Sequence, residues 1–381
     1  MTEPLALYVH WPFCVSKCPY CDFNSHVRAG VDQAAWRAAL LADLRHEAAL
    51  LPGRAVSSIF FGGGTPSLMP PETVAAVIAA ADAAWGLTAD CEITLEANPN
   101  SVEVANFAAL ANAGVNRVSI GVQSFDPQVL EFLGRAHSGD EARAAIAAAQ
   151  AHFARVSFDL IYARPGQSPA AWEAELGAAL AFGTGHLSLY QLTIELGTRF
   201  ATLAAKGELV IPDGDAAADL FDATQAMTRA AGLPRYEVSN HARPGEESRH
   251  NLTYWRYGDY AGIGPGAHGR RLAQATERHR KPENFLAAVE RNSHGLKVES
   301  DLPGRERATE AMLMGLRLTE GVDLTRIEAR SGLARAAFLD SEAAARLAGQ
   351  GLVTLDGDRL AVTDNGILLL DSILSEVVRT G

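Results

Sequence analysis

Short apolar segments alternate with longer mixed segments along the first half of the chain. The short segments are rich in β-branched and aromatic residues and are bounded by turn residues, which is typical of strands. The longer segments have helical periodicity, and several carry a start signal such as Ser101. We expect strands at residues 5–10, 58–61, 91–96, 117–121, 155–161 and 186–192. We expect helices at residues 34–51, 71–84, 101–113, 139–151 and 169–181.

Six β/α units in succession predict a parallel sheet wrapped by helices, because the crossovers between parallel strands are right-handed. Eight such units would complete a barrel. The six legible units therefore predict an α/β fold, a partial, three-quarter TIM-like barrel that occupies residues 1–200. In such folds ligands bind at the carboxyl ends of the strands, so we expect the functional residues there.

The last part of the chain, residues 305–381, is predicted to form a separate domain. We expect helices at residues 308–318, 325–331 and 341–349, a hairpin over 352–362 that turns at Asp356 and Gly357, and a final helix at 365–378. This order resembles a winged helix. Its mixed charge favours a lid or partner-docking module over a DNA reader. Residues 201–304 are interpreted as an extension of the barrel.

Composition narrows the class of protein. Of 381 residues, 33 are Lys or Arg and 45 are Asp or Glu, a formal net charge of −12 that argues against a broad nucleic-acid-binding face. Apolar stretches are interrupted by charges, so no transmembrane segment is expected, although peripheral membrane contact is left open. The first residues lack the pattern of an export signal. With four cysteines and no disulfide framework, we expect a reducing, cytoplasmic location.

Three of the four cysteines, Cys14, Cys18 and Cys21, form a C-x3-C-x2-C run. Pro12 before this run and Pro19 inside it keep the stretch out of a helix, so the thiols decorate a compact loop. Short cysteine spacings are typical of iron–sulfur clusters, and four irons held by three thiolates leave one iron open to a ligand. Structural zinc, with His10 or His26 as fourth ligand, and three unrelated thiols are the alternatives.

A run of glycines follows the second expected strand. Gly62, Gly63 and Gly64 precede Thr65, and without Cβ atoms they let the backbone approach a ligand closely. We expect their free N–H and C=O groups to face a bound cofactor. The alternative is a flexible turn.

Polar residues also interrupt later strands at their carboxyl ends. Glu96, Gln123 and Asp159 occupy these positions. A buried carboxylate is costly without a partner, so a bound ligand is expected, and a salt bridge inside the barrel mouth is the alternative. Arg135 is suited to a bidentate pair with a carboxylate of the ligand.

Several motifs together resemble those of the radical S-adenosylmethionine (radical SAM) superfamily, and in particular its oxygen-independent coproporphyrinogen III oxidase group. The likeness spans essentially the whole chain. The matching motifs are Tyr8-x-His10-x-Pro12-Phe13-Cys14, Gly62-Gly63-Gly64-Thr65-Pro66, Glu96-x-Asn98-Pro99, Gly121-Val122-Gln123-Ser124-Phe125, Arg135 and Asp159-Leu160-Ile161-Tyr162.

The resemblance implies a [4Fe–4S] cluster on Cys14, Cys18 and Cys21, with SAM bound at the open iron. Tyr8 is then expected to pack near the cluster. The other residues implied to bind SAM are Gly63, Gly64, Thr65, Glu96, Gln123, Arg135 and Asp159.

Within that group the chain departs from the oxidases. They carry one more cysteine where this chain has Phe23, and a long arm before the first strand. His250-Asn251-x-x-Tyr254-Trp255 instead resembles the HNxxYW signature of the HemW-type heme chaperones. That resemblance implies heme as a ligand and heme-accepting apoproteins as partners. His250 is expected to ligate the iron, whereas the alternative is a capped turn with Tyr254 and Trp255 in the core.

Three functions remain open at this stage. The first is a heme chaperone with a radical SAM cluster and without coproporphyrinogen oxidase activity. The second is an oxygen-independent coproporphyrinogen III oxidase. The third is a zinc-held docking protein.

Overall fold

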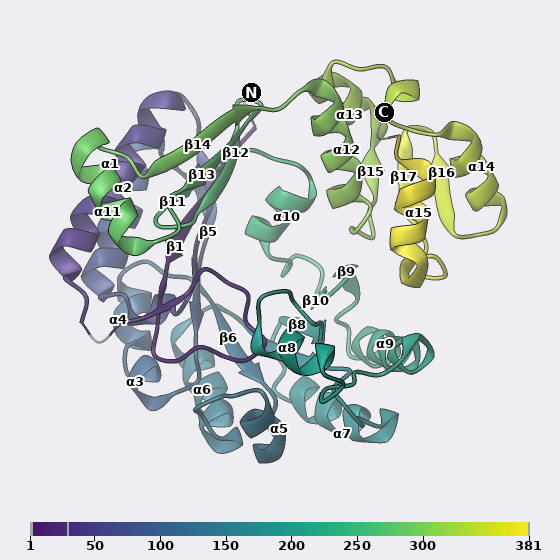
Figure 1. Ribbon diagram of the computed structural model, residues 1–381, viewed down its shortest axis with the longest axis horizontal. Coiled ribbons are helices and arrows are strands. Elements are labelled where there is room, and N and C mark those ends of the chain that lie inside the picture. Colours follow the sequence, from purple (N-terminus) through teal and green to yellow (C-terminus); the bar gives the residue numbers. More distant parts are fainter. Residues whose placement is uncertain (1–2, 29, 380–381) are drawn as a thin grey trace.

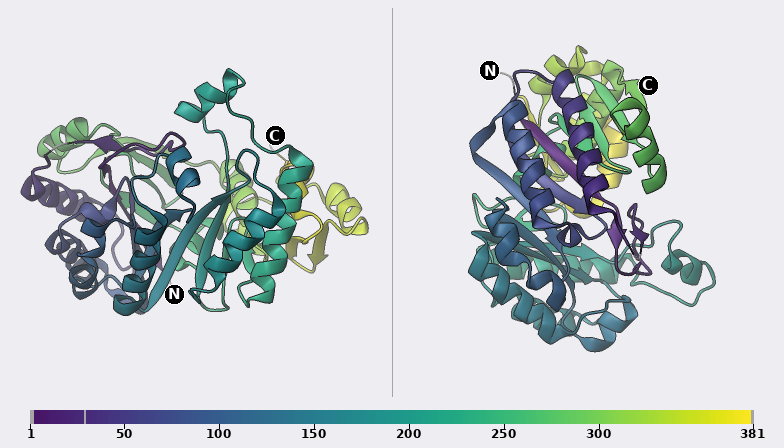
Figure 2. Two further views of the ribbon diagram at one scale, coloured as in Figure 1. Left: turned by 90° about the horizontal axis from the view of Figure 1, so that it is seen from below. Right: turned by 90° about the vertical axis from the view of Figure 1, so that its left-hand side faces the viewer.

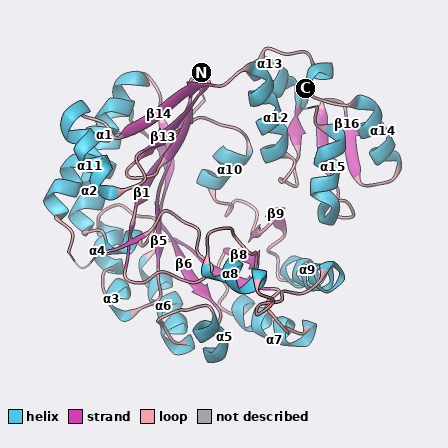
Figure 3. Cartoon of the chain, viewed as in Figure 1, coloured by secondary structure: helices cyan, strands magenta, loops and turns pink. Residues whose placement is uncertain are grey.

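The computed structural model describes residues 3–28 and 30–379, which build one large sheet with helices along its outer side (Figures 1 and 3). Six strands are parallel neighbours in chain order: β1 (Leu5–Trp11), β4 (Val56–Gly63), β5 (Leu87–Ala97), β6 (Arg117–Gln123), β7 (Arg155–Tyr162) and β8 (His186–Gln191). The predicted α/β fold with six parallel units is therefore confirmed. The sheet is open in the described residues, with β14 and β9 at its edges.

Helices in the crossovers bury the outer face of this sheet. They include α1 (Gln33–Leu50), α2 (Pro71–Trp85), α5 (Pro127–Phe132), α6 (Gly139–His152) and α7 (Pro169–Leu180). Leu5, Leu7 and Val9 are fully buried, because alternate residues of β1 point to one face of the sheet and pack there in a core shared with Leu40 and Leu44 of α1. Ser138 begins α6 with a capping box in which its side chain and that of Glu141 satisfy each other's backbone N–H groups.

The helix expected at residues 101–113 is divided into α3 (Ser101–Val104) and α4 (Phe107–Asn112). The side chain of Glu103 is fully buried and accepts hydrogen bonds from Ser67 and from the backbone N–H of Asn98. These bonds hold the first turn toward the strand ends, while Phe107 and Leu110 of α4 pack into the core. A single straight helix would not place Glu103 at the strand ends and also Phe107 and Leu110 in the core.

The middle of the chain extends the sheet at both edges. Beside β1 lies β11 (Tyr260–Ile263), followed by β12 (His268–Arg271), β13 (Gln274–Arg278) and β14 (Leu296–Asp301). Beside β8 lie β10 (Asn240–Ala242) and β9 (Arg235–Glu237). Helices α8 (Arg199–Ala205), α9 (Gly214–Ala230), α10 (Arg249–Trp255) and α11 (Pro282–Asn292) complete this region.

A buried ion-pair cluster fastens the extension to the first helix. Arg278 donates to Glu47 at 2.5 Å and to Asp43 at 3.3 Å, and Arg271 donates to Glu47 at 2.6 Å. All four side chains are at most 1% exposed. Removing one partner would leave a buried charge uncompensated, so the cluster ties β12 and β13 firmly to α1.

The C-terminal unit has a core of its own and lies beside the sheet, at the right of Figure 1. Its elements are α12 (Gly304–Gly315), β15 (Val322–Asp323), α13 (Leu324–Ser331), α14 (Ser341–Gly349), β16 (Val353–Asp356), β17 (Arg359–Val362) and α15 (Leu370–Val377). The expected hairpin is β16–β17, and β15 joins it as a third strand. The expected final helix starts as a 3-10 turn at Ile367–Leu369 before α15. Helix α10 contacts both β4 and α12, and therefore lies between the sheet and this unit.

None of the helices in the described part of the chain combines the length and apolarity needed to cross a membrane.

Candidate functional site

The three clustered cysteines lie on a loop held at its base by backbone pairing. Strand β2 (Phe13–Cys14) runs parallel to β3 (His26–Val27), and the N–H of His26 donates to the carbonyl of Pro12 at 2.7 Å. Helix α8 covers the loop, because the N–H of Phe200 donates to the carbonyl of Pro19 at 3.0 Å. The segment that carries the thiols is therefore anchored at its base and braced along its length.

The glycine turn packs against the base of this loop. The N–H groups of Gly64 and Thr65 donate to the carbonyls of Trp11 and Phe13 at 2.7 and 2.8 Å, and the N–H of Gly63 donates to Glu96 at 3.3 Å. The N–H groups of Gly63 and Gly64 are therefore not free, because both are used inside the protein. The expectation that carbonyl groups of the glycine turn face a cofactor stays a prediction. A Cβ on Gly64 would lie 2.7 Å from the carbonyl oxygen of Phe13. The glycines thus allow two backbone segments to meet.

Arg135 connects two of the cysteines through a short polar network. Its guanidinium donates to the sulfur of Cys18 at 3.4 Å and to the side-chain oxygen of Asn98 at 2.6 Å. Asn98 donates to the hydroxyl of Thr65 at 3.1 Å, and that hydroxyl donates to the sulfur of Cys14 at 3.5 Å. The Nε of Arg135 is buried and makes no hydrogen bond with the described residues. The network thus retains one donor for a ligand.

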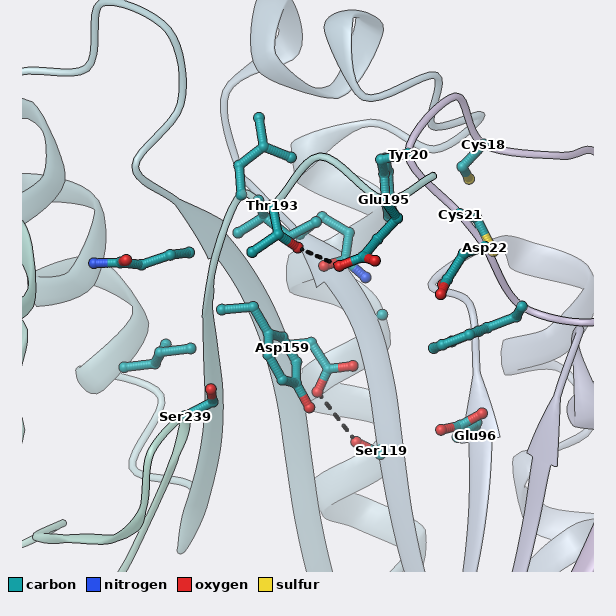
Figure 4. Close-up of a pocket in the computed structure, with 18 of the residues that line it drawn as sticks. Cys18, Tyr20, Cys21, Asp22, Glu96, Ser119, Asp159, Thr193, Glu195 and Ser239 are labelled. Atoms are coloured by element: carbon teal, nitrogen blue, oxygen red, sulfur yellow. Dashed lines mark hydrogen bonds between the residues drawn. The ribbon is translucent and has the colours of Figure 1, made fainter. Parts of the chain in front are cut away.

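Two carboxylates line the same cavity as the thiols: in Figure 4 Glu96 lies on the side of Cys18 and Cys21, and Asp159 lies in the middle. Burial and the neighbouring charge of Asp159 raise the pKa of Glu96 to about 8. Burial also raises the pKa of Asp159 to about 6, although hydrogen bonds from Ser188 and Ser119 partly counter it. Their shifted pKa values favour a cationic ligand, which would restore the charged form of both groups.

These groups share one cavity of about 1120 Å³. Cys14, Cys18, Cys21, Gly63, Gly64, Thr65, Glu96, Gln123, Arg135 and Asp159 all line it. Its opposite wall comes from α9, the segment before β10 and the C-terminal unit, through Phe221, Val238, Arg317, Leu368 and Leu369. In Figure 4 Cys18 and Cys21 lie on one side, Asp159 in the middle and Ser239 on the other side.

The donor set fits an iron–sulfur cluster and SAM. Three thiols face one cavity, and Arg135 donates a hydrogen bond to one of them, Cys18, at 3.4 Å. Burial raises the pKa of Cys14 and Cys21, so a bound metal would have to displace their protons. SAM carries a sulfonium and an ammonium group, which match the Glu96 and Asp159 carboxylates. Its carboxylate matches the buried Nε of Arg135.

The zinc alternative finds no support in the described residues. No three His, Cys, Asp or Glu side chains among them converge on a position for a single metal ion. His10 is engaged at both ring nitrogens, with the Tyr8 hydroxyl at 2.9 Å and the Asn24 carbonyl at 2.9 Å. His26 contacts the Asn24 side chain at 3.3 Å. His10 therefore has no free nitrogen for a metal.

Two predicted site residues do not line the cavity. Tyr8 lies below the glycine turn, with its hydroxyl on His10, and burial raises its pKa. His250 is fully buried between β4 and α10. Its nitrogens bond to the Ser58 hydroxyl at 2.9 Å and the Tyr254 hydroxyl at 2.6 Å. Burial lowers its pKa to about 3, so the ring is neutral. Because both ring nitrogens are engaged in hydrogen bonds, His250 is not poised to ligate heme iron.

Several lining residues were not predicted from the sequence. Asn98 bridges Arg135 to Thr65, and Glu103 anchors Asn98. Asn98 is part of the motif Glu96-x-Asn98-Pro99, so the sequence offered a signal for it. Arg317 and Leu369 lie far beyond the strand ends in the sequence, and no local pattern marks them as members of the site.

Comparisons with known proteins agree with this geometry. The model of the radical SAM superfamily matches residues 8–176, and the model of the HemN C-terminal domain matches residues 302–369. The structure of the coproporphyrinogen III oxidase HemN from Escherichia coli, described as a radical SAM enzyme, superposes with a TM-score of 0.81 at 26% identity. That match covers 98% of this chain and 89% of the other. The fold is therefore the α/β fold of the radical SAM proteins, which implies a [4Fe–4S] cluster and SAM.

Sequence relatives define the family more narrowly. The Escherichia coli protein named heme chaperone HemW is 40% identical, over 97% of both chains. The Mycobacterium tuberculosis protein of the same name is 38% identical, over 98% of this chain and 94% of its own. A mitochondrial radical S-adenosyl methionine domain-containing protein 1 from Bos taurus is 42% identical, over 98% of this chain and 87% of its own. The chain belongs to the HemW family of radical SAM proteins.

Proposed function

We propose that this protein is a heme chaperone, which holds heme in its large cavity and passes it to heme-accepting apoproteins. The observation that carries the proposal is the composition of the wall opposite the cysteines. Phe221, Val238, Leu368 and Leu369 line it, and the two leucines are 48% and 47% exposed. Exposed apolar side chains of this size at a cavity usually meet an apolar ligand. Relatives named heme chaperone support heme as that ligand.

The proposal includes a [4Fe–4S] cluster on Cys14, Cys18 and Cys21, with SAM beside it. When bound, this pair supplies one-electron reductive chemistry to the cavity. Arg135 and Asn98 would hold the SAM carboxylate, and Glu96 would take its ammonium group. Gln123 at the end of β6 and Asp159 of β7 also line the cavity. Thiols that must stay reduced suit the cytoplasm.

The test is hemin titration of the anaerobically reconstituted protein, followed by transfer. We expect one equivalent of hemin to shift the Soret band on binding. The hemin should then pass to an added apocytochrome b at a rate that rises with apocytochrome concentration. A transfer rate equal to spontaneous hemin release would contradict the chaperone role, and absence of a Soret shift would contradict heme binding itself.

An oxygen-independent coproporphyrinogen III oxidase is the second candidate, because the HemN structure superposes over nearly the whole chain. Phe23, which is 59% exposed at the cavity, stands where the resemblance places a further cysteine in the oxidases. Incubation with coproporphyrinogen III, SAM and a reductant separates the two functions. We expect no protoporphyrinogen, and its formation in repeated turnovers would favour the oxidase.

A further inference from the structure

Arg317 is the cation of the apolar cavity wall. It follows α12 and lines the cavity together with Phe221, Val238 and the leucines of the 3-10 turn, whereas the other cavity cations, Lys17 and Arg135, belong to the cysteine side. Asp371 is the acidic residue of the same wall. A mostly apolar surface with one cation is suited to a flat apolar ligand that carries a carboxylate.

The guanidinium of Arg317 is held in place without being saturated. Its central carbon lies 4.8 Å from the centre of the Trp255 ring, a cation–π contact. Its nearest carboxylate is that of Glu237, at 3.8 Å, and Glu237 also accepts from the N–H of Ser239 at 3.1 Å and from Asn240. Among the described residues Arg317 Nε is buried and has no hydrogen-bond partner. The side chain is 33% exposed and retains donors for a ligand.

Trp255 connects this cation to α10, the helix of the HNxxYW segment. At the start of α10 His250 binds Ser58 of β4, and at its end Trp255 lies under Arg317. Helix α10 thus spans from the sheet to the cavity wall. Neither His250 nor Trp255 lines the cavity. The HNxxYW segment is therefore connected to the cavity through the contact of Trp255 with Arg317.

We propose that Arg317 binds a propionate carboxylate of heme and that Trp255 is its positioning residue. This inference rests on the proposed heme-binding function and assigns one ligand group to one side chain. In this role Trp255 holds the guanidinium of Arg317 in place and does not contact the porphyrin. The apolar residues of the wall would cover the macrocycle while Arg317 sets its orientation.

The experiment compares hemin with hemin dimethyl ester, whose propionates carry no charge, in one detergent-containing buffer. Arg317→Gln should weaken hemin binding about tenfold, the worth of one charge-assisted bidentate pair, and should leave ester binding unchanged. Arg291→Gln is the matched control, because Arg291 is an exposed arginine of α11 outside the cavity. It should change neither affinity.

Variants of Trp255 test the positioning role. Trp255→Phe keeps a ring under the guanidinium and should retain most of the preference for hemin over its ester. Trp255→Leu should lose that preference, and adding Arg317→Gln to it should cost little more, because the two side chains act as one unit. Iron content and thermal unfolding of each variant establish that the fold and cluster are intact.

The outcomes separate the inference from the function on which it rests. Wild-type protein that binds no hemin would overturn both. Wild-type protein that binds hemin, with Arg317→Gln affecting hemin and ester equally or neither of them, would overturn the role of Arg317 alone. Additive effects of the Trp255→Leu and Arg317→Gln changes would overturn the positioning role.

Discussion

At the scale of single residues, the four cysteines divide according to their surroundings. Cys14, Cys18 and Cys21 line the cavity, whereas Cys91 is a buried residue of β5, 8% exposed. Cys14→Ala should therefore remove almost all bound iron and the visible cluster absorption after anaerobic reconstitution, because two thiolates are too few for the cluster. Cys91→Ala is the matched control and should bind iron like the wild type. Full iron content in Cys14→Ala would exclude it as a ligand.

Glu96 gives SAM binding a pH dependence of predictable sign. Its pKa is raised to about 8, so the SAM-free carboxyl is mostly neutral at lower pH and must ionise to pair with the ammonium group. SAM affinity should rise about tenfold per pH unit as pH approaches 8, and fall again at higher pH, where the α-amino group of SAM loses its proton. Glu96→Gln should bind SAM weakly and without this slope in calorimetric titrations. The control Glu342→Gln, on the exposed face of α14, should keep the slope.

The same pKa shift affects stability in the absence of ligand. The folded protein holds a proton on Glu96 that the unfolded chain releases near its ordinary pKa of 4.5. Folding is therefore favoured by proton uptake, and this contribution is lost as pH rises from about 4.5 to about 8. Denaturant unfolding of SAM-free wild type should show a fall in stability across that window. In Glu96→Gln the fall should be smaller. An unchanged fall would mean that other groups cause it.

At the scale of elements, the turn after β4 depends on the absence of a side chain. Gly63 has a φ of +118°, and a Cβ there would lie 2.7 Å from the His10 ring and 2.8 Å from the Trp11 carbonyl. Gly63→Ala should cost about 3 kcal/mol or more in the free energy of unfolding, because neither neighbour can move freely. Gly86, the residue that ends α2, also has a positive φ, +73°, but no atom within 4 Å of a Cβ. Gly86→Ala should cost only about 1 kcal/mol.

The elements that the sequence predicted well are those with strong local patterns. The six parallel strands, most crossover helices and the β16–β17 hairpin follow from apolar periodicity and turn residues. Helix α9 and the strands β9 to β14 were not predicted. For β9 and β10 the reason is their length, because three residues are too few to show a period. The division at α3 and α4 depends on Glu103, whose partners Ser67 and Asn98 come from other segments.

The same distinction applies to the site: some of its residues could be predicted from the local sequence, and others only from the fold. Cys14, Glu96 and Asp159 could be predicted because each carries chemistry at a recognisable place in a strand or loop. His250 was assigned to heme because its segment resembles the HNxxYW signature, yet its two ring nitrogens are hydrogen-bonded to Ser58 and Tyr254. Only the packing of α10 against β4 reveals this. Arg317 is the opposite case, because it belongs to no sequence motif and only the fold places it at the cavity.

At the scale of the whole molecule, the cavity belongs to two units that have separate cores. The first carries the cysteines and the strand ends, and the C-terminal unit contributes other residues to the lining of the cavity. The left view of Figure 2 shows the C-terminal unit, in yellow, to the right of the strands. A ligand that fills the cavity would touch both units and hold them together, whereas the cluster and SAM need only the first. If heme fills the cavity as proposed, a mutation in the C-terminal unit should weaken heme binding and leave cluster binding unchanged.

A substitution at Leu369 should separate heme binding from cluster binding, because Leu369 lines the cavity from the C-terminal unit and is 47% exposed. Leu369→Asp places a charge where the macrocycle would pack, and hemin affinity should fall at least about tenfold, since burying an unpaired carboxylate is costly. Iron content and SAM affinity should stay at wild-type values. Leu355→Asp is the matched control, because Leu355 is 41% exposed on β16 of the same unit and does not line the cavity. Equal loss of hemin in both variants would mean that the C-terminal unit acts through its stability, whereas loss in Leu369→Asp alone would place heme between the two units.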